Sequence, residues 1–100
     1  LNTAKLSLRF AGDDTFAVFQ NEPNPFNDKT TISFNLPAAS DAMLKVFDVT
    51  GKVIYTNKGS FGKGMNSFVL SKADLPANGV MIYQIESGAN VDTKKMIGLE

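Results

Sequence analysis

The sequence predicts an all-β domain built as an antiparallel β-sandwich, and three observations carry this prediction. Short segments of alternating apolar and polar residues recur along the chain, separated by Gly, Pro and Asn turn signals. No segment shows the apolar period of about 3.6 residues that a long helix would need. Residues 80–86 are apolar on both faces near their centre, which is typical of a strand inside a sheet.

The first part of the chain contains two or three expected strands. Residues 4–10 alternate, but they fit either the first strand of this domain or the last strand of a preceding one. Residues 1–15 are therefore a linker or a first strand. A short extended segment is expected at 16–19, and 30–36 alternate clearly. Pro37 ends that strand, because proline cannot donate to a sheet ladder.

The second part is organised around a hairpin signal. Residues 43–49 and 52–57 flank Thr50-Gly51, where glycine can take the positive φ of a tight turn. Ser71 is expected to cap a single helical turn. Further strands are expected at 66–70, 80–86 and 91–99. The sum is seven or eight strands, which predicts an immunoglobulin-like antiparallel β-sandwich.

Composition argues against several classes of function. Ten basic and ten acidic residues cancel without forming blocks, so a nucleic-acid surface is not expected. The chain has no Cys and no His, which removes thiolate metal ligands and the side chain best suited to proton transfer near neutral pH. No apolar run approaches the roughly 20 residues of a membrane span. We therefore expect no enzyme activity, no cofactor, no metal, no nucleic-acid partner and no membrane insertion.

Several residues are candidates for a metal site, a structural role or a partner contact. Asp13-Asp14 could contribute to a calcium site, but paired aspartates beside a glycine are more typical of a solvated turn. Asp48 is expected to accept backbone N–H bonds in the hairpin. Most aromatic residues fall on core positions; Phe61, in a Gly-rich segment, could contact a partner but more readily folds back onto the sheet edge. Without Trp, a carbohydrate-binding surface is poorly supplied.

The most unusual segment is 21–27, with the sequence NEPNPFN. Its prolines fix two φ angles and favour extended conformations in the residues before them. Asn24 and Asn27 are able to bond their own backbone two residues on, and Phe26 is expected to place its ring in the core. A rigid loop between strands is the plain interpretation, and a partner-binding surface is the alternative. The motif residues are Asn21, Pro23, Asn24, Pro25, Phe26 and Asn27.

The last expected strand combines basic and apolar residues. Alternation places Lys95 and Ile97 on one side and Lys94 and Met96 on the other, so neither side is wholly apolar. Such a strand is expected at an accessible edge, where lysines discourage aggregation. A partner could recognise it there by strand addition. The candidate partner-binding residues are Lys94, Lys95, Met96 and Ile97.

Four further motifs follow the 21–27 motif along the chain. They are Thr30-x-Ile32-x-Phe34-x-Leu36-Pro37, Leu44-x-Val46-Phe47-Asp48-Val49-x-Gly51, Gly79-Val80 and Thr93-Lys94-Lys95-Met96-Ile97. This succession resembles the C-terminal sorting domains of the type IX secretion system, type A, of the Por secretion system family, over roughly residues 16–98. Two features depart from the family pattern. Met81 stands where the family often has Tyr, and the chain ends Gly98-Leu99-Glu100, in which Leu99 and Glu100 match a common expression-tag remnant.

The resemblance implies a role in export. Members of this family reach the periplasm by an ordinary signal peptide and carry the sorting domain behind an N-terminal cargo domain. An outer-membrane translocon recognises the domain, and a surface sortase often removes it, so the expected location is secreted or cell-surface. The alternatives are a structural immunoglobulin-like spacer and a carbohydrate-binding module of a secreted multidomain protein.

Overall fold

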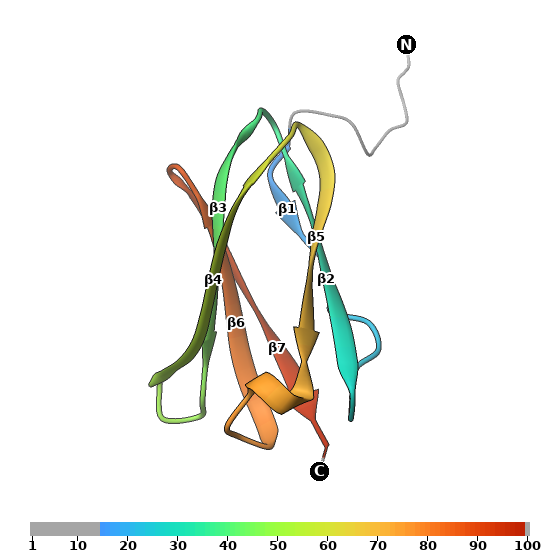
Figure 1. The fold of residues 1–100 in the computed structure, drawn as a ribbon. Coiled ribbons are helices and arrows are strands. Elements are labelled where there is room, and N and C mark those ends of the chain that lie inside the picture. The colour runs from blue at the N-terminus through green and yellow to red at the C-terminus, as the bar shows by residue number, and fades with distance from the viewer. Residues whose placement is uncertain (1–14, 100) are drawn as a thin grey trace.

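The computed structural model describes residues 15–99, and these form two antiparallel sheets packed face to face (Figure 1). One sheet has the strand order β1-β2-β5 and the other β4-β3-β6-β7. The predicted antiparallel β-sandwich is confirmed. The strands are β1 (Ala17–Val18), β2 (Lys29–Leu36), β3 (Ser40–Phe47), β4 (Val53–Phe61), β5 (Gly64–Ser71), β6 (Gly79–Ser87) and β7 (Asn90–Gly98), with a short 3₁₀ helix η1 (Lys72–Asp74). The strand expected at 4–10 lies outside the described residues.

The core is made by alternate residues of the strands, as the sequence pattern indicates. Ile32, Phe34 and Leu36 of β2 are completely buried, and they face Leu44 and Val46 of β3 across the sandwich. Burial of such side chains contributes about 1.5–3 kcal/mol each, which makes this layer the main source of stability. The other completely buried apolar side chains are Leu70, Met81, Tyr83, Ile85 and Met96.

β6 is an interior strand, as predicted, and β7 is an edge strand. β6 pairs with β3 on one side and with β7 on the other. Gly79 begins β6 with a φ of 84°, a conformation that favours glycine. β7 pairs only with β6 among the strands of its sheet, so its other edge is available for contacts outside the sheet.

β4 is longer than the sequence predicts. The strand expected at 52–57 continues through the Gly-rich segment to Phe61, and only the connection from there to Gly64 turns. The Phe61 ring packs edge-on against Phe34 and Phe68, with centroids 5.1 Å apart in both pairs. The ring also covers Gly59, where a Cβ would stand 3.1 Å from it. Phe61 therefore folds back onto the core, as the favoured interpretation had it.

The short helical turn forms where it was expected, but not with the expected cap. Ser71 occupies the N-cap position of η1 and makes no side-chain capping bond. Its predicted capping role is therefore wrong. The first N–H of the turn is satisfied by the backbone instead, because Lys72 N donates to Asp28 O at 2.6 Å.

Candidate functional site

The loop at residues 21–27 reaches from one sheet to the edge of the other. It connects β1 and β2 of the three-stranded sheet, yet its backbone lies along β7 of the four-stranded sheet. Phe26 N donates to Ile97 O at 3.1 Å, and Leu99 N donates to Phe26 O at 2.8 Å. Phe26 thus forms a parallel bridge with Gly98. The loop therefore extends the sheet by one short strand-like contact.

Two side chains complete this contact. Asn24 Oδ1 accepts a hydrogen bond from Ile97 N at 2.9 Å, and Gln20 Nε2 donates to Lys95 O at 2.7 Å. With the two backbone bonds of Phe26, these groups occupy the outer edge of β7 from Lys95 to Leu99. We call this set of four hydrogen bonds the clasp. The expectation that Asn24 would bond its own backbone is wrong, because its carboxamide oxygen is engaged 73 residues away.

Phe26 anchors the loop, as predicted. Its side chain is 1% exposed and belongs to the core cluster, whereas Pro23, Pro25 and Asn27 are exposed. The peptide bonds before both prolines are cis. The motif therefore consists of one buried aromatic ring held between solvent-exposed residues, with its backbone bonded to β7.

A buried polar network supports the loop from below. Asn21 is 1% exposed, and its Nδ2 donates to Pro23 O at 3.2 Å and to Thr30 Oγ1 at 3.0 Å. Asn21 N donates to Tyr83 Oη at 3.0 Å, and Tyr83 Oη donates to Phe19 O at 2.7 Å. Burial of the phenol raises the pKa of Tyr83 to about 12. These groups satisfy one another away from water, so each depends on the others.

Sequence reasoning identified Asn21 but missed Thr30 and Tyr83. A signal for both was present, because each polar residue shares the inward side of its strand with apolar neighbours. Thr30 alternates with Ile32 on β2, and Tyr83 alternates with Ile85 on β6. A polar group at an inward position needs a partner, and the loop provides it.

The clasp corrects the expectation that the last strand offers a free edge. At Lys95–Leu99 the edge-facing N–H and C=O groups are already bonded to Gln20, Asn24 and Phe26. Strand addition there would have to displace the clasp. Met96 is also no surface contact, since its side chain is completely buried. Lys94 shares that inner side and is half-buried, while Lys95 and Ile97 lie on the outer face.

Met81, which stands where the family often has Tyr, packs close to Gly98 of β7. Met81 is completely buried, and its methyl carbon lies 2.8 Å from the position that a Cβ would take at Gly98. Lys72 Cε lies 3.0 Å from the same position. A side chain at residue 98 would therefore have to displace two neighbours, which accounts for glycine at this point of β7.

The other motif residues build a turn. Asp48 Oδ1 accepts hydrogen bonds from Thr50 N at 2.9 Å, Thr50 Oγ1 at 2.6 Å and Lys52 N at 3.1 Å. This confirms the acceptor role predicted for Asp48. These bonds, that of the Thr50 hydroxyl first, lower the pKa of the Asp48 carboxyl. Gly51 completes the turn with a φ of 89°.

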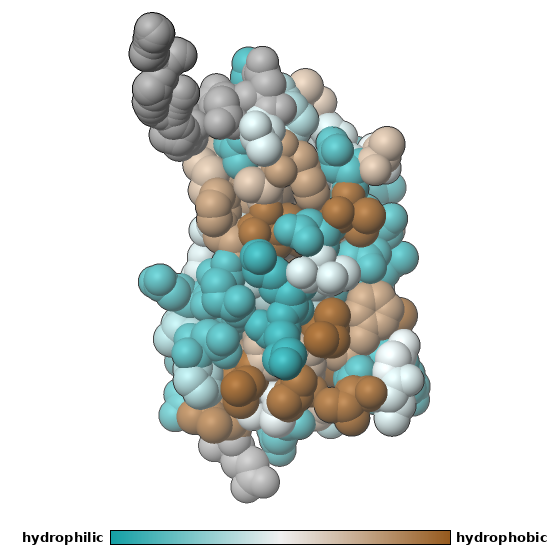
Figure 2. Space-filling view, turned by 180° about the vertical axis from the view of Figure 1, so that it is seen from behind, coloured by the Kyte–Doolittle hydropathy of each residue, from teal (hydrophilic) through white to brown (hydrophobic). Residues whose placement is uncertain are grey.

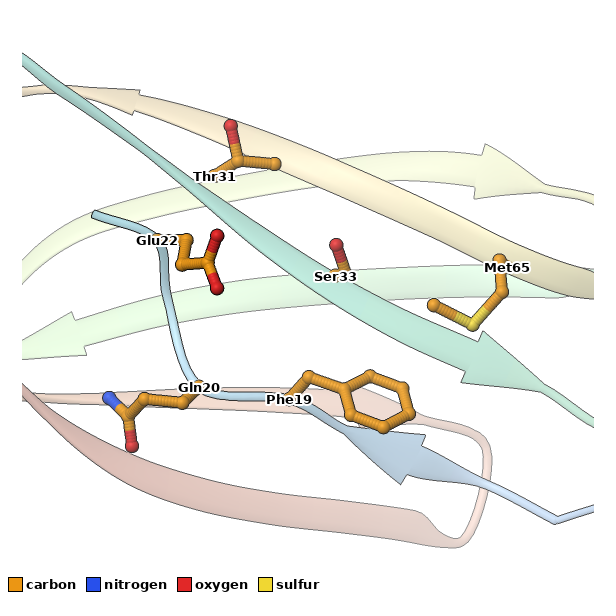
Figure 3. A pocket seen from close by; sticks show the side chains of 6 residues that line it. All are labelled: Phe19, Gln20, Glu22, Thr31, Ser33 and Met65. Carbon is orange, nitrogen blue, oxygen red and sulfur yellow. The ribbon is translucent and has the colours of Figure 1, made fainter. Parts of the chain in front are cut away.

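A shallow hollow lies beside the loop, on the outer face of the three-stranded sheet. Its volume is about 430 Å³, and it is lined by Phe19, Gln20, Glu22, Thr31, Ser33 and Met65. Figure 3 shows the Phe19 ring and Met65 at one end and the Glu22 carboxylate nearer the other. Glu22 is the single carboxylate of this lining, whereas a glycosidase needs a pair. The hollow offers contact surface without a matched acid and base.

Neither a cluster of metal-ligating side chains nor a membrane-spanning helix is found in residues 15–99. Within that range, no three His, Cys, Asp or Glu side chains come together in a way that could hold a metal ion. Asp13-Asp14, weighed above as possible calcium ligands, lie outside it. The same part of the chain contains no helix with the length and apolar character needed to cross a membrane.

Comparison with known proteins agrees with the geometry. A family model described as "Secretion system C-terminal sorting domain" matches residues 22–99. The match begins inside the loop motif and includes the whole of β7, so it covers the clasp bonds made by Asn24 and Phe26 but not the one made by Gln20. A search of curated proteins gave no match. The chain therefore belongs to the secretion system C-terminal sorting domain family, the sorting signals of type IX secretion.

Proposed function

We propose that this domain directs an N-terminal cargo across the outer membrane by being recognised by the type IX translocon, after which a surface sortase acts on it. The domain itself carries out no reaction and needs no cofactor. The cargo reaches the cell surface or the medium through the periplasm. Family membership supports the export role, and the arrangement of the motifs supports recognition of a folded domain.

The observation that carries this proposal is the clasp. The first and the last motif of the sequence, 21–27 and 93–97, lie far apart along the chain but are joined by hydrogen bonds through Asn24 and Phe26. A receptor that met this domain folded would find both motifs on one side of it. The signal is therefore a surface assembled by folding, and an extended peptide of the same sequence would lack it.

A reporter fusion tests the proposal. A periplasmic reporter enzyme is joined to residues 1–100, and its location is compared in a type IX-competent host and in the same host lacking the outer-membrane translocon. We expect surface or released reporter only in the competent host. Reporter that stays in the periplasm of both hosts, with a folded and intact fusion, would contradict the proposed function.

Deleting residues 94–98 should also block export, but that deletion removes more than a signal. It takes Met96 out of the core and removes the backbone groups to which Phe26 and Asn24 bond. The double substitution Lys94→Ala and Lys95→Ala is cleaner, because neither side chain belongs to the core cluster. Lys95 is exposed and Lys94 is half-buried, and surface substitutions shift stability by only about 0.5 kcal/mol each. We expect this variant to stay folded and to be exported less efficiently.

A further inference from the structure

The outer face of the four-stranded sheet carries an apolar patch at one end. The register places Val53 beside Phe47 and Phe47 beside Ile82, so three apolar residues lie next to one another across three strands. Val80 pairs with Ile97 in the adjoining row. Directly paired residues on one face have Cβ atoms about 4.5–5.5 Å apart. The patch consists of Phe47, Val53, Val80, Ile82 and Ile97.

This patch is exposed and sharply bounded. Val53, Val80 and Ile97 are 45%, 40% and 36% exposed. The next row of the same face is polar and consists of Lys45, Thr56, Gln84 and Thr93. Lys45 forms a salt bridge with Glu86 of the row beyond, with 3.0 Å between Nζ and Oε1, and that row also contains Met43 and Val91. In Figure 2, hydrophobic side chains gather near the C-terminal end of the molecule, and a band of hydrophilic side chains lies above them. Single exposed apolar residues are common, whereas contiguous groups bounded by polar residues mark interaction surfaces.

Lys95 is a charged residue at the border of the patch, in the same row as Phe47 and Ile82. Lys95 pairs with Ile82 and is exposed on the same face. Among residues 15–99 the Lys95 ammonium takes part in no salt bridge. A partner that covered the patch would remove water from around this ammonium, which is costly unless an opposite charge meets it. The complementary surface is therefore apolar with a carboxylate at the position facing Lys95.

The clasp holds the patch in place. Both backbone polar groups of Ile97 that face the sheet edge are bonded, the N–H to Asn24 and the C=O to Phe26. This fixes the strand and keeps the Ile97 side chain on the outer face. In Figure 1 the turn between β3 and β4 and the end of β7 lie at the lower end, while β1 lies in the upper half. A partner at the patch would therefore leave the region where the chain enters β1 uncovered.

We propose that this patch, with Lys95 at its border, is the surface through which the domain docks onto a protein of the export machinery. The docking surface of that protein is apolar and presents a carboxylate to Lys95. The inference rests on the proposed function and adds which face is read. It divides the four C-terminal candidates, because Lys95 and Ile97 would contact the partner, whereas Lys94 and Met96 would not.

The test compares two sets of substitutions in the reporter fusion. The patch set is Val53→Thr, Val80→Thr and Ile97→Thr. The control set is Met65→Thr, Val69→Thr and Val91→Thr, which are 49%, 58% and 56% exposed and lie away from the patch. Threonine keeps the β-branched shape of the valines and of Ile97, and at every one of these positions, Met65 included, it removes apolar contact area. We expect surface export of the patch set to fall about tenfold below that of the control set. Their thermal midpoints should agree within about 5 °C.

A charge reversal tests the border. Lys95→Glu should reduce export, and Lys58→Glu, at the other end of the same sheet, should leave it unchanged. Equal export by these two variants would overturn the role given to Lys95. Normal export of the patch set, with export abolished by deletion of the whole domain, would overturn the patch and leave the proposed function intact. If deletion of the whole domain did not reduce export, the proposed function itself would fall. A stable dimer of the domain that the patch set dissolves would assign the patch to self-association and overturn the inference.

Discussion

Two turns of this domain are stabilised in opposite ways, one by local hydrogen bonds and the other by long-range ones. The turn at 48–52 is held by three hydrogen bonds from neighbouring groups to one Asp48 oxygen. The loop at 21–27 is held mainly by groups on β6 and β7, which are 62 to 75 residues away for the bonds of Asn21, Asn24 and Gln20. The partners of the first turn lie within four residues of Asp48. The second exists only once both sheets have assembled.

In the loop at 21–27, the residues that restrict the backbone differ from those that bind the loop to the rest of the domain. Prolines 23 and 25 restrict the backbone of the loop, but the loop is tied down by Phe26, Asn24 and the Asn21–Tyr83 network. Substitutions in the loop should therefore act on the whole domain, whereas substitutions in the turn should act locally. Four experiments test that contrast, beginning with the largest expected effect.

Removing the anchor should have the largest effect. Phe26→Ala should lower the free energy of unfolding by about 3–5 kcal/mol, because it empties a completely buried site. Phe19→Ala is the control, since Phe19 is 45% exposed, and it should cost much less. Denaturant unfolding followed by circular dichroism measures both. If the two variants proved equally stable, the loop would not be tied to the core through Phe26.

Tyr83→Phe should have the second largest effect. It leaves the buried N–H of Asn21 without its acceptor, which costs about 1–3 kcal/mol. Because burial raises the pKa of Tyr83 to about 12, the folded state holds the phenol proton more tightly than the unfolded state does. Its contribution is complete below about pH 10 and is lost as the pH rises towards 12. The stabilities of the wild type and Tyr83→Phe should therefore converge over that range in unfolding titrations. A constant difference from pH 9 to 12 would contradict the buried network.

Asn24→Ala should have a smaller effect, of about 0.5–1.5 kcal/mol, since it removes one hydrogen bond in a solvent-accessible position. Its specific readout is hydrogen exchange, because the Ile97 amide loses its acceptor and should exchange faster. Asn27→Ala, in the same loop, should leave that amide protected. Unchanged exchange of Ile97 in Asn24→Ala would show that the side chain does not close the clasp.

Asp48→Asn should have the smallest effect. It retains an oxygen acceptor for the turn and removes the charge. The hydrogen bonds lower the pKa of Asp48 below its usual value of 3.8. Its contribution is therefore present above about pH 4 and is lost as the pH falls below that value. The wild type should lose slightly more stability than Asp48→Asn between pH 5 and pH 2, and a larger loss by the variant would contradict this assignment.

The contrast between the two turns also explains what the sequence could and could not predict. The Asp48 acceptor, the Gly51 turn and the buried Phe26 ring were predicted correctly, because each depends on local chemistry or on alternation along a strand. The clasp was not predicted, since half of its bonds join backbone groups that have no side-chain signature. For the same reason β7 was expected to be open along its edge. Its position at an edge and the division of its side chains between two faces were read correctly from alternation alone.

The clasp also constrains the order in which the domain can fold during synthesis. A chain is made from its N-terminal side, so Phe26 emerges from the ribosome long before Ile97 and Leu99, to which its backbone bonds. Until β7 arrives, β6 has an unpaired edge, and the core lacks Met96. Exposed apolar surface and unpaired edges make such partly made chains prone to aggregation. Closure of this domain therefore waits for β7, and a chain interrupted before β7 would keep the edge of β6 unpaired and part of its core exposed.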